Sequence, residues 1–330
     1  MSVAVVTGAS GLLGANVAAA LREAGHEVRC TRRATSKVDH LDHLGLSWVE
    51  ADLTDPDALT RAFDGAAAVF HCAAQVDIRP RATPAMERAN VEGTGHVCAA
   101  VGAVGARLVH CSTTSAVGLA TGAADAHEDT PLNFADHGLH DGYVDTKHRA
   151  EEAVRRAVAH EGLDAVIVNP GFLFGPYDRK PSSGAMILAV KHGRTVAWTP
   201  GTNSFVDVRD VAAGMLLAWQ HGTAGRRYIL GGENLCYRDA FQRIAAVVGG
   251  RAPTRAVPWS AMWALGKLGD VAERVTGREQ ELNSTKARWA FCDGFRFSSR
   301  RAEEELGYTR RPLEEGIEAA HAWFLERGMA

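Results

Sequence analysis

The chain has 330 residues, which is long enough for one large domain or two modest ones that share a core. Its 36 Lys and Arg residues nearly balance 39 Asp and Glu residues, so the formal net charge of -3 leaves no basic surplus for binding nucleic acid. The start lacks the pattern of a signal peptide, and no run approaches the roughly 18 apolar residues of a membrane span. We expect a cytoplasmic protein with no nucleic-acid partner and no membrane span.

Short apolar runs alternate with helix-length stretches through the first half of the chain. The runs are "SVAVVTG", "EVRCTRR", "LSWVEADL", "AAAVFHCAA", "ARLVHCSTTSA" and "DAVIVNPG". Runs of this length and composition predict buried parallel strands joined by crossover helices. The sequence therefore predicts an α/β fold with a doubly wound, Rossmann-type parallel sheet. Such sheets bind ligands at the carboxyl ends of their strands, so the functional residues are expected there.

The alternation loosens after Pro170, where Gly, Pro and Ser become frequent before a second helix-rich region. We predict a smaller, mainly helical substrate lobe beside the dinucleotide-binding domain. The expected boundaries are 1–169 for the dinucleotide-binding domain with 205–232 returning to it, 170–204 and 233–312 for the substrate lobe, and 313–330 for a C-terminal helix.

One stretch of that lobe, residues 258–275, has apolar residues near helical spacing, among them Trp259, Trp263 and Leu268. Such a helix either packs in the protein or attaches to a membrane surface. Its polar face lacks the richness in Lys and Arg that interfacial helices have. We therefore interpret it as a core or lid helix.

The six cysteines are scattered and form no CxxC pair, which favours reduced thiols. Two His-Cys pairs, His71-Cys72 and His110-Cys111, come at the ends of predicted strands. Neighbouring side chains of a strand point to opposite faces, so one pair cannot easily close on a single ion. We expect no metal site.

Three glycines in "TGASGLLG", Gly8, Gly11 and Gly14, lie directly between the first predicted strand and the first predicted helix. Gly8 would allow a sharp turn, Gly11 would let the backbone approach a pyrophosphate, and Gly14 would let the helix pack closely on the strand. A plain strand-to-helix turn would explain one glycine but not three in register. We predict a dinucleotide site here, which also includes the loop residues Ser10, Leu12 and Leu13.

The second predicted strand ends in Arg32 and Arg33, where an enzyme specific for NAD would place a carboxylate. A guanidinium pairs with a 2′-phosphate that a carboxylate would repel, so NADP is the expected cofactor, with NAD possible. The alternative is that both arginines are solvated surface charges, because alternation along a strand prevents both from pointing inward.

Other strand ends add further expected contacts to the cofactor. Asp52 and Leu53 are placed to touch the adenine, and Ala73 and Ala74 are small enough to let the cofactor lie against the strand end. Pro170 ends the strand in "NPG" and is assigned to the same site.

Tyr143 and Lys147 stand four residues apart in a predicted helix, so both side chains lie on one face. An ammonium group nearby would lower the pKa of the tyrosine and let it exchange a proton with a substrate oxygen. The pair alone is a weak signal. Its place after the glycine loop and after the hydroxyl cluster "STTS", residues 112–115, makes it much stronger.

In this order of motifs the chain resembles the extended short-chain dehydrogenase/reductase superfamily, also called the NAD-dependent epimerase/dehydratase family. The resemblance runs nearly end to end, through "TGASGLLG", "ADLTD", "FHCAA", "NVEGT", "CSTTSAVG", "YVDTK", "NPGFLFGP" and "FVDVRDVA". Within the family the chain looks most like the dihydroflavonol-reductase-like branch, including the hopanoid-associated sugar epimerase-like proteins. The family commonly pairs subunits, so the resemblance implies a homodimer.

The resemblance implies roles for several residues. Tyr143 would be the proton donor and acceptor, Lys147 would bind the nicotinamide ribose and tune Tyr143, and Thr113 would hold the substrate oxygen. Ser112 is the fallback for Thr113. Asn90 in "NVEGT" would be a structural support.

Two departures from the family narrow the expected chemistry. Sugar-nucleotide dehydratases carry Asp-Glu after the catalytic threonine, where this chain has Thr114 and Ser115. Many epimerases carry an arginine before the "FVDVRD" segment, where this chain has "TNS". We therefore expect a carbonyl reductase or alcohol dehydrogenase acting on a small molecule. The alternatives are an NAD-dependent sugar epimerase and a nucleotide-binding regulator without turnover.

Overall fold

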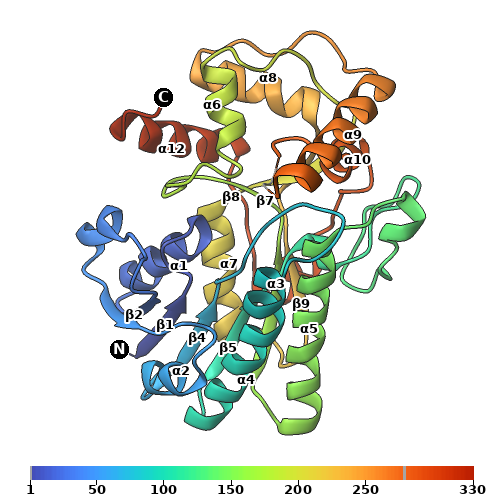
Figure 1. The fold of residues 1–330 in the computed structure, drawn as a ribbon. Helices are drawn as coiled ribbons and strands as arrows, with labels where there is room; N and C mark the ends of the chain where they lie inside the picture. The colour runs from blue at the N-terminus through green and yellow to red at the C-terminus, as the bar shows by residue number, and fades with distance from the viewer. Residues whose placement is uncertain (1, 278–279) are drawn as a thin grey trace.

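The six apolar runs of the first half form six strands of a seven-stranded sheet in the computed structural model, which describes residues 2–277 and 280–330 (Figure 1). All neighbouring strands of this sheet are parallel. The strand order is β3-β2-β1-β4-β5-β6-β9. The strands are β1 (Val3–Thr7), β2 (Glu27–Arg32), β3 (Ser47–Glu50), β4 (Ala68–His71), β5 (Arg107–Cys111), β6 (Ala165–Pro170) and β9 (Arg227–Leu230).

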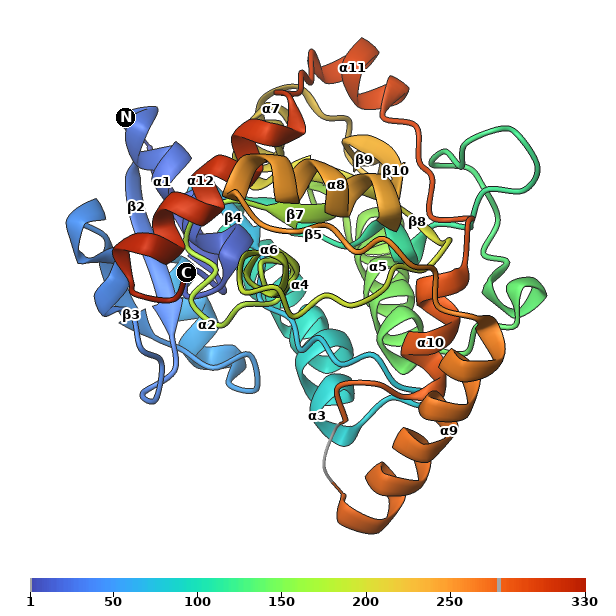
Figure 2. The same cartoon turned by 90° about the horizontal axis from the view of Figure 1, so that it is seen from above.

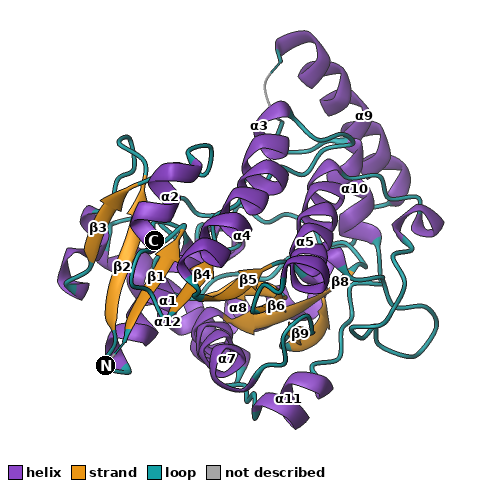
Figure 3. Ribbon diagram, turned by 90° about the horizontal axis from the view of Figure 1, so that it is seen from below, coloured by secondary structure: helices purple, strands orange, loops and turns teal. Residues whose placement is uncertain are grey.

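Helices cover both faces of the sheet, as Figure 3 shows from below. One face packs against α1 (Leu12–Glu23) and α7 (Val208–His221), which also contact each other. The other face packs against α2 (Pro56–Phe63), α4 (Gly93–Val104) and α5 (Gly142–Glu161). Because both faces are covered, β4 and β6 are buried along their whole length. The predicted doubly wound, Rossmann-type fold is confirmed.

The strand order reverses at β1, with β2 on one side and β4 on the other. The chain therefore leaves β1 and β4 in opposite directions, and a crevice opens between their carboxyl ends. In open α/β sheets this is where ligands bind.

The smaller lobe is built on a second sheet of three strands, in the order β10-β8-β7. These are β7 (Phe172–Phe174), β8 (Thr202–Asp207) and β10 (Glu233–Cys236). Their aromatic side chains form a separate core with α6 (Ala185–Lys191), α8 (Tyr237–Val248) and α12 (Leu313–Glu326). In this core Phe174 stacks on Phe205 with ring centroids 5.7 Å apart.

The remaining elements lie in the segments between these strands and helices. They are η1 (Asp39–Leu44), α3 (Pro84–Met86), the π-helical η2 (Glu87–Glu92), η3 (Thr114–Ala116), η4 (Phe134–His137), α9 (Trp259–Thr276), α10 (Ser284–Phe291) and α11 (Arg300–Leu306). None of the helices described within 2–277 and 280–330 is long and apolar enough to cross a membrane.

Of the two roles predicted for residues 258–275, core or lid helix, the core role is wrong and the lid role stays a prediction. These residues form α9, in which Gly266 is the one buried residue. The helix lies at the outer edge of the molecule in Figures 2 and 3. Its apolar spacing is helical, as predicted, but most of its apolar side chains face away from the protein. Periodicity identifies which residues share a face and says nothing of what that face contacts.

Candidate active site and cofactor cavity

Two glycines of the first loop are required by the folding of the chain itself. Gly8 has a φ of +73°, and a Cβ atom there would lie 2.6 Å from the nitrogen of Ala73. A Cβ atom on Gly14 would lie 2.3 Å from the carbonyl oxygen of Gly8. Gly8 therefore lets β1 approach the end of β4, and Gly14 lets α1 pack on the turn.

Gly11 differs from both, because a Cβ atom there would meet only the Gly8 oxygen, at 3.4 Å. Gly11 is exposed and is the N-cap residue of α1. No side chain caps this helix, and its first turn holds no acidic residue. The first N–H groups of α1 are thus available at the positive end of the helix dipole, an arrangement suited to an anion such as a pyrophosphate.

A cavity of about 450 Å³ opens beside this loop at the carboxyl ends of β1, β2 and β4. Nine residues predicted to bind the cofactor line it: Gly8, Ser10, Gly11, Arg32, Arg33, Asp52, Leu53, Ala73 and Ala74. Lining residues that were not predicted are Thr31, Ser36, Ala51, Thr54, Cys72, Gln75, Ala85, Arg88 and Ala89. The small and polar walls fit the adenosine end of a dinucleotide.

Other predicted contacts lie outside this cavity. Leu13 belongs to the core between the sheet and helices α1 and α7, and Leu12 packs against that core. Gly14 is buried against the backbone of Gly8. Tyr143 and Lys147 lie on α5, and Pro170 is the buried last residue of β6. Their contact with a cofactor stays a prediction.

Arg32 and Arg33 both line the cavity, which corrects the argument that only one of them could face it. The strand β2 ends at Arg32, so the alternation of side chains does not extend to Arg33. Arg33 lies close enough to Asp52 to lower the pKa of its carboxyl, although the larger cause is the hydrogen bond from the backbone N–H of Thr54. A third guanidinium, that of Arg88, enters from η2.

The first turn of α5 places Tyr143. Asp141 is the N-cap residue, and its carboxylate accepts hydrogen bonds from the backbone N–H groups of Tyr143 at 2.7 Å and Val144 at 3.3 Å. Burial raises the pKa of Asp141 to about 7. A Cβ atom on Gly142 would lie 2.0 Å from the nitrogen of Ala82, so the loop before α3 lies directly on the start of α5.

Tyr143 and Thr113 are neighbours at the end of β5, where the Thr113 hydroxyl partly opposes the rise that burial causes in the pKa of Tyr143. Thr113 is partly accessible, whereas Ser112 is buried and its hydroxyl has no hydrogen-bond partner among the described residues. The geometry therefore favours Thr113 over Ser112 as the hydroxyl that faces a substrate.

Lys147 lies one turn further along α5 and is 3% exposed. Its Nζ donates a hydrogen bond of 2.7 Å to the carbonyl oxygen of Cys111, the last residue of β5. Burial lowers the pKa of Lys147, and nearby negative groups, Glu151 among them, oppose that shift. The expectation of a lowered Tyr143 pKa is wrong for this structure: burial raises it, because desolvation outweighs any effect of the ammonium group.

Asn90 ties the loop after β4 to α5. Its side chain exchanges two hydrogen bonds with the backbone of Gln75, at 2.7 and 2.9 Å, and donates a third to the hydroxyl of Thr146 at 3.1 Å. Thr146 lies between Tyr143 and Lys147 in sequence. Asn90 therefore links one wall of the cofactor cavity to the catalytic helix.

A buried polar network that includes Asn169 of β6 holds the backbone of Thr113. The fully buried Asn169 donates hydrogen bonds to the carbonyl oxygen of Thr113 at 2.9 Å and to the carboxylate of Glu151 at 3.0 Å. Glu151 also pairs with Arg227 of β9 at 3.0 Å. Arg227 in turn donates to the carbonyl oxygen of Glu128 at 2.6 Å. The network thus joins β5, β6, β9 and α5.

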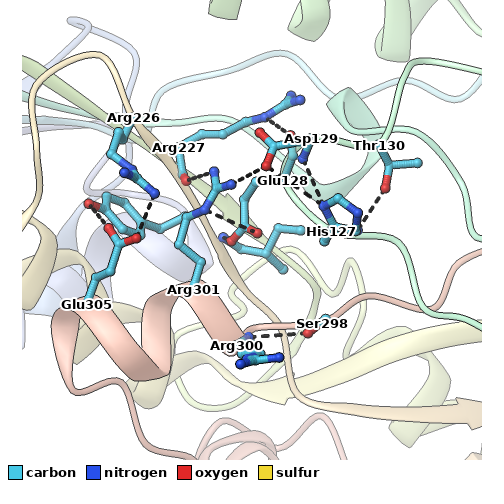
Figure 4. Close-up of polar contacts among 12 residues, drawn as sticks. His127, Glu128, Asp129, Thr130, Arg226, Arg227, Ser298, Arg300, Arg301 and Glu305 are labelled. Carbon is cyan, nitrogen blue, oxygen red and sulfur yellow. Dashed lines mark hydrogen bonds and ion pairs between the residues drawn. The ribbon is translucent and has the colours of Figure 1, made fainter.

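Figure 4 shows the outer end of this network. Arg301, from the first turn of α11, pairs with Asp129 and lies 3.8 Å from the carboxylate of Glu128. Beside them Arg226 pairs with Glu305 at 2.6 Å. These ion pairs fix α11 and the loop at 127–130 against β9.

The two predicted strand ends with His-Cys pairs lie side by side. The ring centroids of His71 and His110 are 5.5 Å apart, and the Cys111 thiol donates to the carbonyl oxygen of Ser112. Burial lowers the pKa of His71 to about 3, so this ring is neutral at physiological pH. No group of three or more His, Cys, Asp or Glu side chains with the spacing of a metal site occurs among the residues that the structure describes.

Comparison with known proteins agrees with this geometry. Residues 4–231 match the model of the NAD dependent epimerase/dehydratase family. The chain belongs to this family. Over 98% of its length it is 33% identical to a dihydroflavonol 4-reductase-like protein of Synechocystis sp., of which the match covers 94%, and 36% identical to sterol demethylase protein B of Methylococcus capsulatus, of which it covers 99%.

Among solved structures, a nucleoside-diphosphate-sugar epimerase from Pseudomonas aeruginosa superposes with a TM-score of 0.81. The two chains are 28% identical, and the match covers 99% of each. As a member of the epimerase/dehydratase family, the chain is an NAD(P)-dependent enzyme with a cavity that fits a dinucleotide.

The glycine loop of this family member yields a first prediction. Gly14→Ala should lower the free energy of unfolding by about 3 kcal/mol or more, because the new Cβ would overlap backbone atoms that cannot move away. Gly11→Ala should lower it by less than about 1 kcal/mol. Urea denaturation measures both changes. Gly11→Ala should instead weaken NADPH binding in a fluorescence titration, and unchanged affinity would show that no phosphate approaches this turn.

Asp141 yields a second prediction, on stability against pH. Its pKa of about 7 in the folded protein is above its usual value of 3.8, so between these pH values only the folded state holds the proton. The free energy of unfolding should therefore fall as pH rises from about 4 to about 7, by on the order of 3 kcal/mol from this group. Asp141→Asn should have a flatter profile across that window in urea denaturation. Parallel profiles would contradict the assignment.

Proposed function

We propose that the chain is an NADP-preferring carbonyl reductase that interconverts an aldehyde or ketone and its alcohol. The observation that carries this proposal is that Thr113 and Tyr143 are neighbours at the end of β5, with the cation of Lys147 one helical turn beyond. All three lie at the carboxyl edge of the sheet, where the family binds its ligands.

The three side chains can divide the work of the reduction. A bound nicotinamide dinucleotide supplies the hydride. The hydroxyl of Thr113 holds the substrate oxygen by a hydrogen bond, and the phenol of Tyr143 gives that oxygen its proton. Burial raises the pKa of Tyr143, so the phenol keeps its proton at neutral pH until the substrate oxygen becomes basic. The charge of Lys147 then favours the phenolate that remains.

The residues after Thr113 support reduction over dehydration. Thr114 and Ser115 are both buried in η3, and neither can supply the acid and base that elimination of water needs. The lining of the cofactor cavity supports NADP, because it includes three arginines, Arg32, Arg33 and Arg88. The dihydroflavonol 4-reductase-like relative is named for an activity of this kind.

The sugar epimerase is the second candidate, because a solved nucleoside-diphosphate-sugar epimerase matches the whole chain. Both reactions use the same hydride and proton geometry. They differ in the fate of the cofactor, since a reductase exchanges it every cycle and an epimerase regenerates it in place.

The third prediction separates the two candidates. The purified enzyme should release little nicotinamide on denaturation, and it should consume NADPH in step with aldehydes or ketones from an apolar panel. Tyr143→Phe should lower kcat by orders of magnitude with little change in cofactor affinity, because only the exchangeable proton is lost. Tyr177→Phe serves as the control, since its hydroxyl bonds His43 away from this site. Tightly held NAD and isomerisation of a sugar without net change in nicotinamide absorbance would favour the epimerase.

The fourth prediction tests the choice of cofactor. Arg33→Ala should weaken the binding of NADPH more than that of NADH, by about 1.5 to 3 kcal/mol, if a charged hydrogen bond to the 2′-phosphate is lost. The dissociation constants of NADPH and NADH, measured for the parent and for the Arg33→Ala variant, give the loss of binding free energy for each cofactor. Equal losses for NADPH and NADH would show that Arg33 does not bind the 2′-phosphate.

A further inference from the structure

The helix α9 carries most of the exposed apolar surface of the protein. Ten large apolar side chains are exposed in the described part of the chain, and six of them lie in this helix. Leu268 and Val275 are 67% and 79% exposed. The six are Trp259, Trp263, Leu265, Leu268, Val271 and Val275.

Seven apolar residues of α9 form one unbroken face, and Trp259 and Trp263 lie outside it. At 3.6 residues per turn, the apolar arc spans roughly a third of the helix circumference. It consists of Ala261, Ala264, Leu265, Leu268, Val271, Ala272 and Val275 and contains no polar residue.

Glycines on the opposite side of α9 turn this arc outward. A Cβ atom on Gly269 would lie 1.9 Å from the carbonyl oxygen of Leu282, and one on Gly266 would lie 3.0 Å from the Cα of Ser284. The helix therefore lies tightly against the start of α10 through its smallest residues. The large side chains of the apolar arc, Leu265, Leu268, Val271 and Val275, are each more than half exposed, whereas Trp259 packs on Phe291 of α10.

Cations flank the apolar arc. Lys267 and Arg274 lie along one edge of it and also line a cavity of about 910 Å³, together with Arg79, Arg81 and Arg288. Residues 251–288 hold seven Lys or Arg and four Asp or Glu, so this segment is positive in a chain whose net charge is -3.

The two carboxylates of that cavity are already engaged by their own surroundings. Asp270 accepts hydrogen bonds from Lys267 and from the backbone N–H of Ser284, at 3.2 and 2.9 Å. Glu273 accepts one from Asn283 at 3.2 Å. By contrast, no carboxylate of the described residues pairs with Arg81, Arg274 or Arg288. The guanidinium of Arg288 lies over the ring of Trp259, 5.9 Å from its centroid, whereas those of Arg81 and Arg274 are open to an external anion.

We propose that α9 docks the protein on an anionic lipid surface. Its apolar arc would lie among the upper acyl chains, and Lys267, Arg274 and the arginines of the adjacent cavity would meet the lipid phosphates. The polar face of the helix is poor in Lys and Arg by sequence. Neighbouring elements add positive charge beside α9, because Arg79 and Arg81 come from the loop before α3 and Arg288 comes from α10.

A second copy of the chain is a poorer occupant of this face. The helix is about 27 Å long and its apolar arc about 10 Å wide, an area on the order of 300 Å². A stable interface needs about 800 Å² from each partner. A lipid surface has no such minimum, and it meets the cations with opposite charge. This proposal does not depend on which reaction the enzyme catalyses.

The fifth prediction is tested by co-sedimentation of the full chain with two kinds of vesicle. One is pure phosphatidylcholine, and the other has equal parts of phosphatidylcholine and phosphatidylglycerol. The protein should bind the anionic vesicles, and Leu268→Ser with Val271→Ser should weaken that binding at least tenfold, which is about the transfer free energy of one buried side chain. Lys267→Gln or Arg274→Gln should each weaken it about fivefold on anionic vesicles only.

The matched control is Leu325→Ser, which removes a leucine of 51% exposure from α12 on the far side of the molecule (Figure 2). It should leave vesicle binding unchanged. All these side chains are exposed, so each variant should keep the unfolding temperature of the parent. Absent binding to anionic vesicles, or binding that is insensitive to the α9 substitutions, overturns the proposal. So does a dimer in light scattering that dissociates in the Leu268→Ser, Val271→Ser variant, because a second copy would then cover the face.

Discussion

The positive charge of Lys147 lies where water is excluded, and the surrounding structure compensates for that charge. Its Nζ donates to the carbonyl oxygen of Cys111, and the carboxylate of Glu151 lies one turn further along α5. Glu151 is itself held by Asn169 and Arg227. A buried group stays charged only where hydrogen bonds and an opposite charge replace its hydration. Lys147 therefore needs these partners to stay protonated. The same contacts fix α5 against the ends of β5 and β6, which places Tyr143 beside Thr113.

The fold could be predicted from sequence because its main signals are local. A parallel sheet covered on both faces needs continuous apolar strands, and six of the seven strands lie in apolar runs that were predicted as strands. The glycine loop is local too, since Gly8 and Gly14 are required by backbone contacts within one turn and its neighbouring strand. The order of motifs then adds Thr113, Tyr143 and Lys147.

What could not be predicted depends on contacts between distant segments. Arg88 lines the cofactor cavity from a π-helical turn that no sequence pattern predicts. Asn169 joins Thr113 to Glu151 across three elements, and none of these residues has a local signature for that role. The pKa of Tyr143 depends on the balance between burial and nearby charge, which residue types alone do not give. The outward orientation of α9 is likewise set by Gly266 and Gly269 on its opposite side.

The contact between Gly142 and Ala82 limits how this enzyme can diversify. The backbone of the loop before α3 lies directly on the first turn of the catalytic helix, with Gly142 donating to the carbonyl oxygen of Arg79 at 2.9 Å. Insertions or bulkier residues there would displace Tyr143. The smaller lobe has close glycine contacts of its own, at Gly266 and Gly269 for example, but none of them bears on the helix that carries Tyr143. Changes of substrate range are therefore expected to accumulate in that lobe, while the loop before α3 stays nearly constant in length.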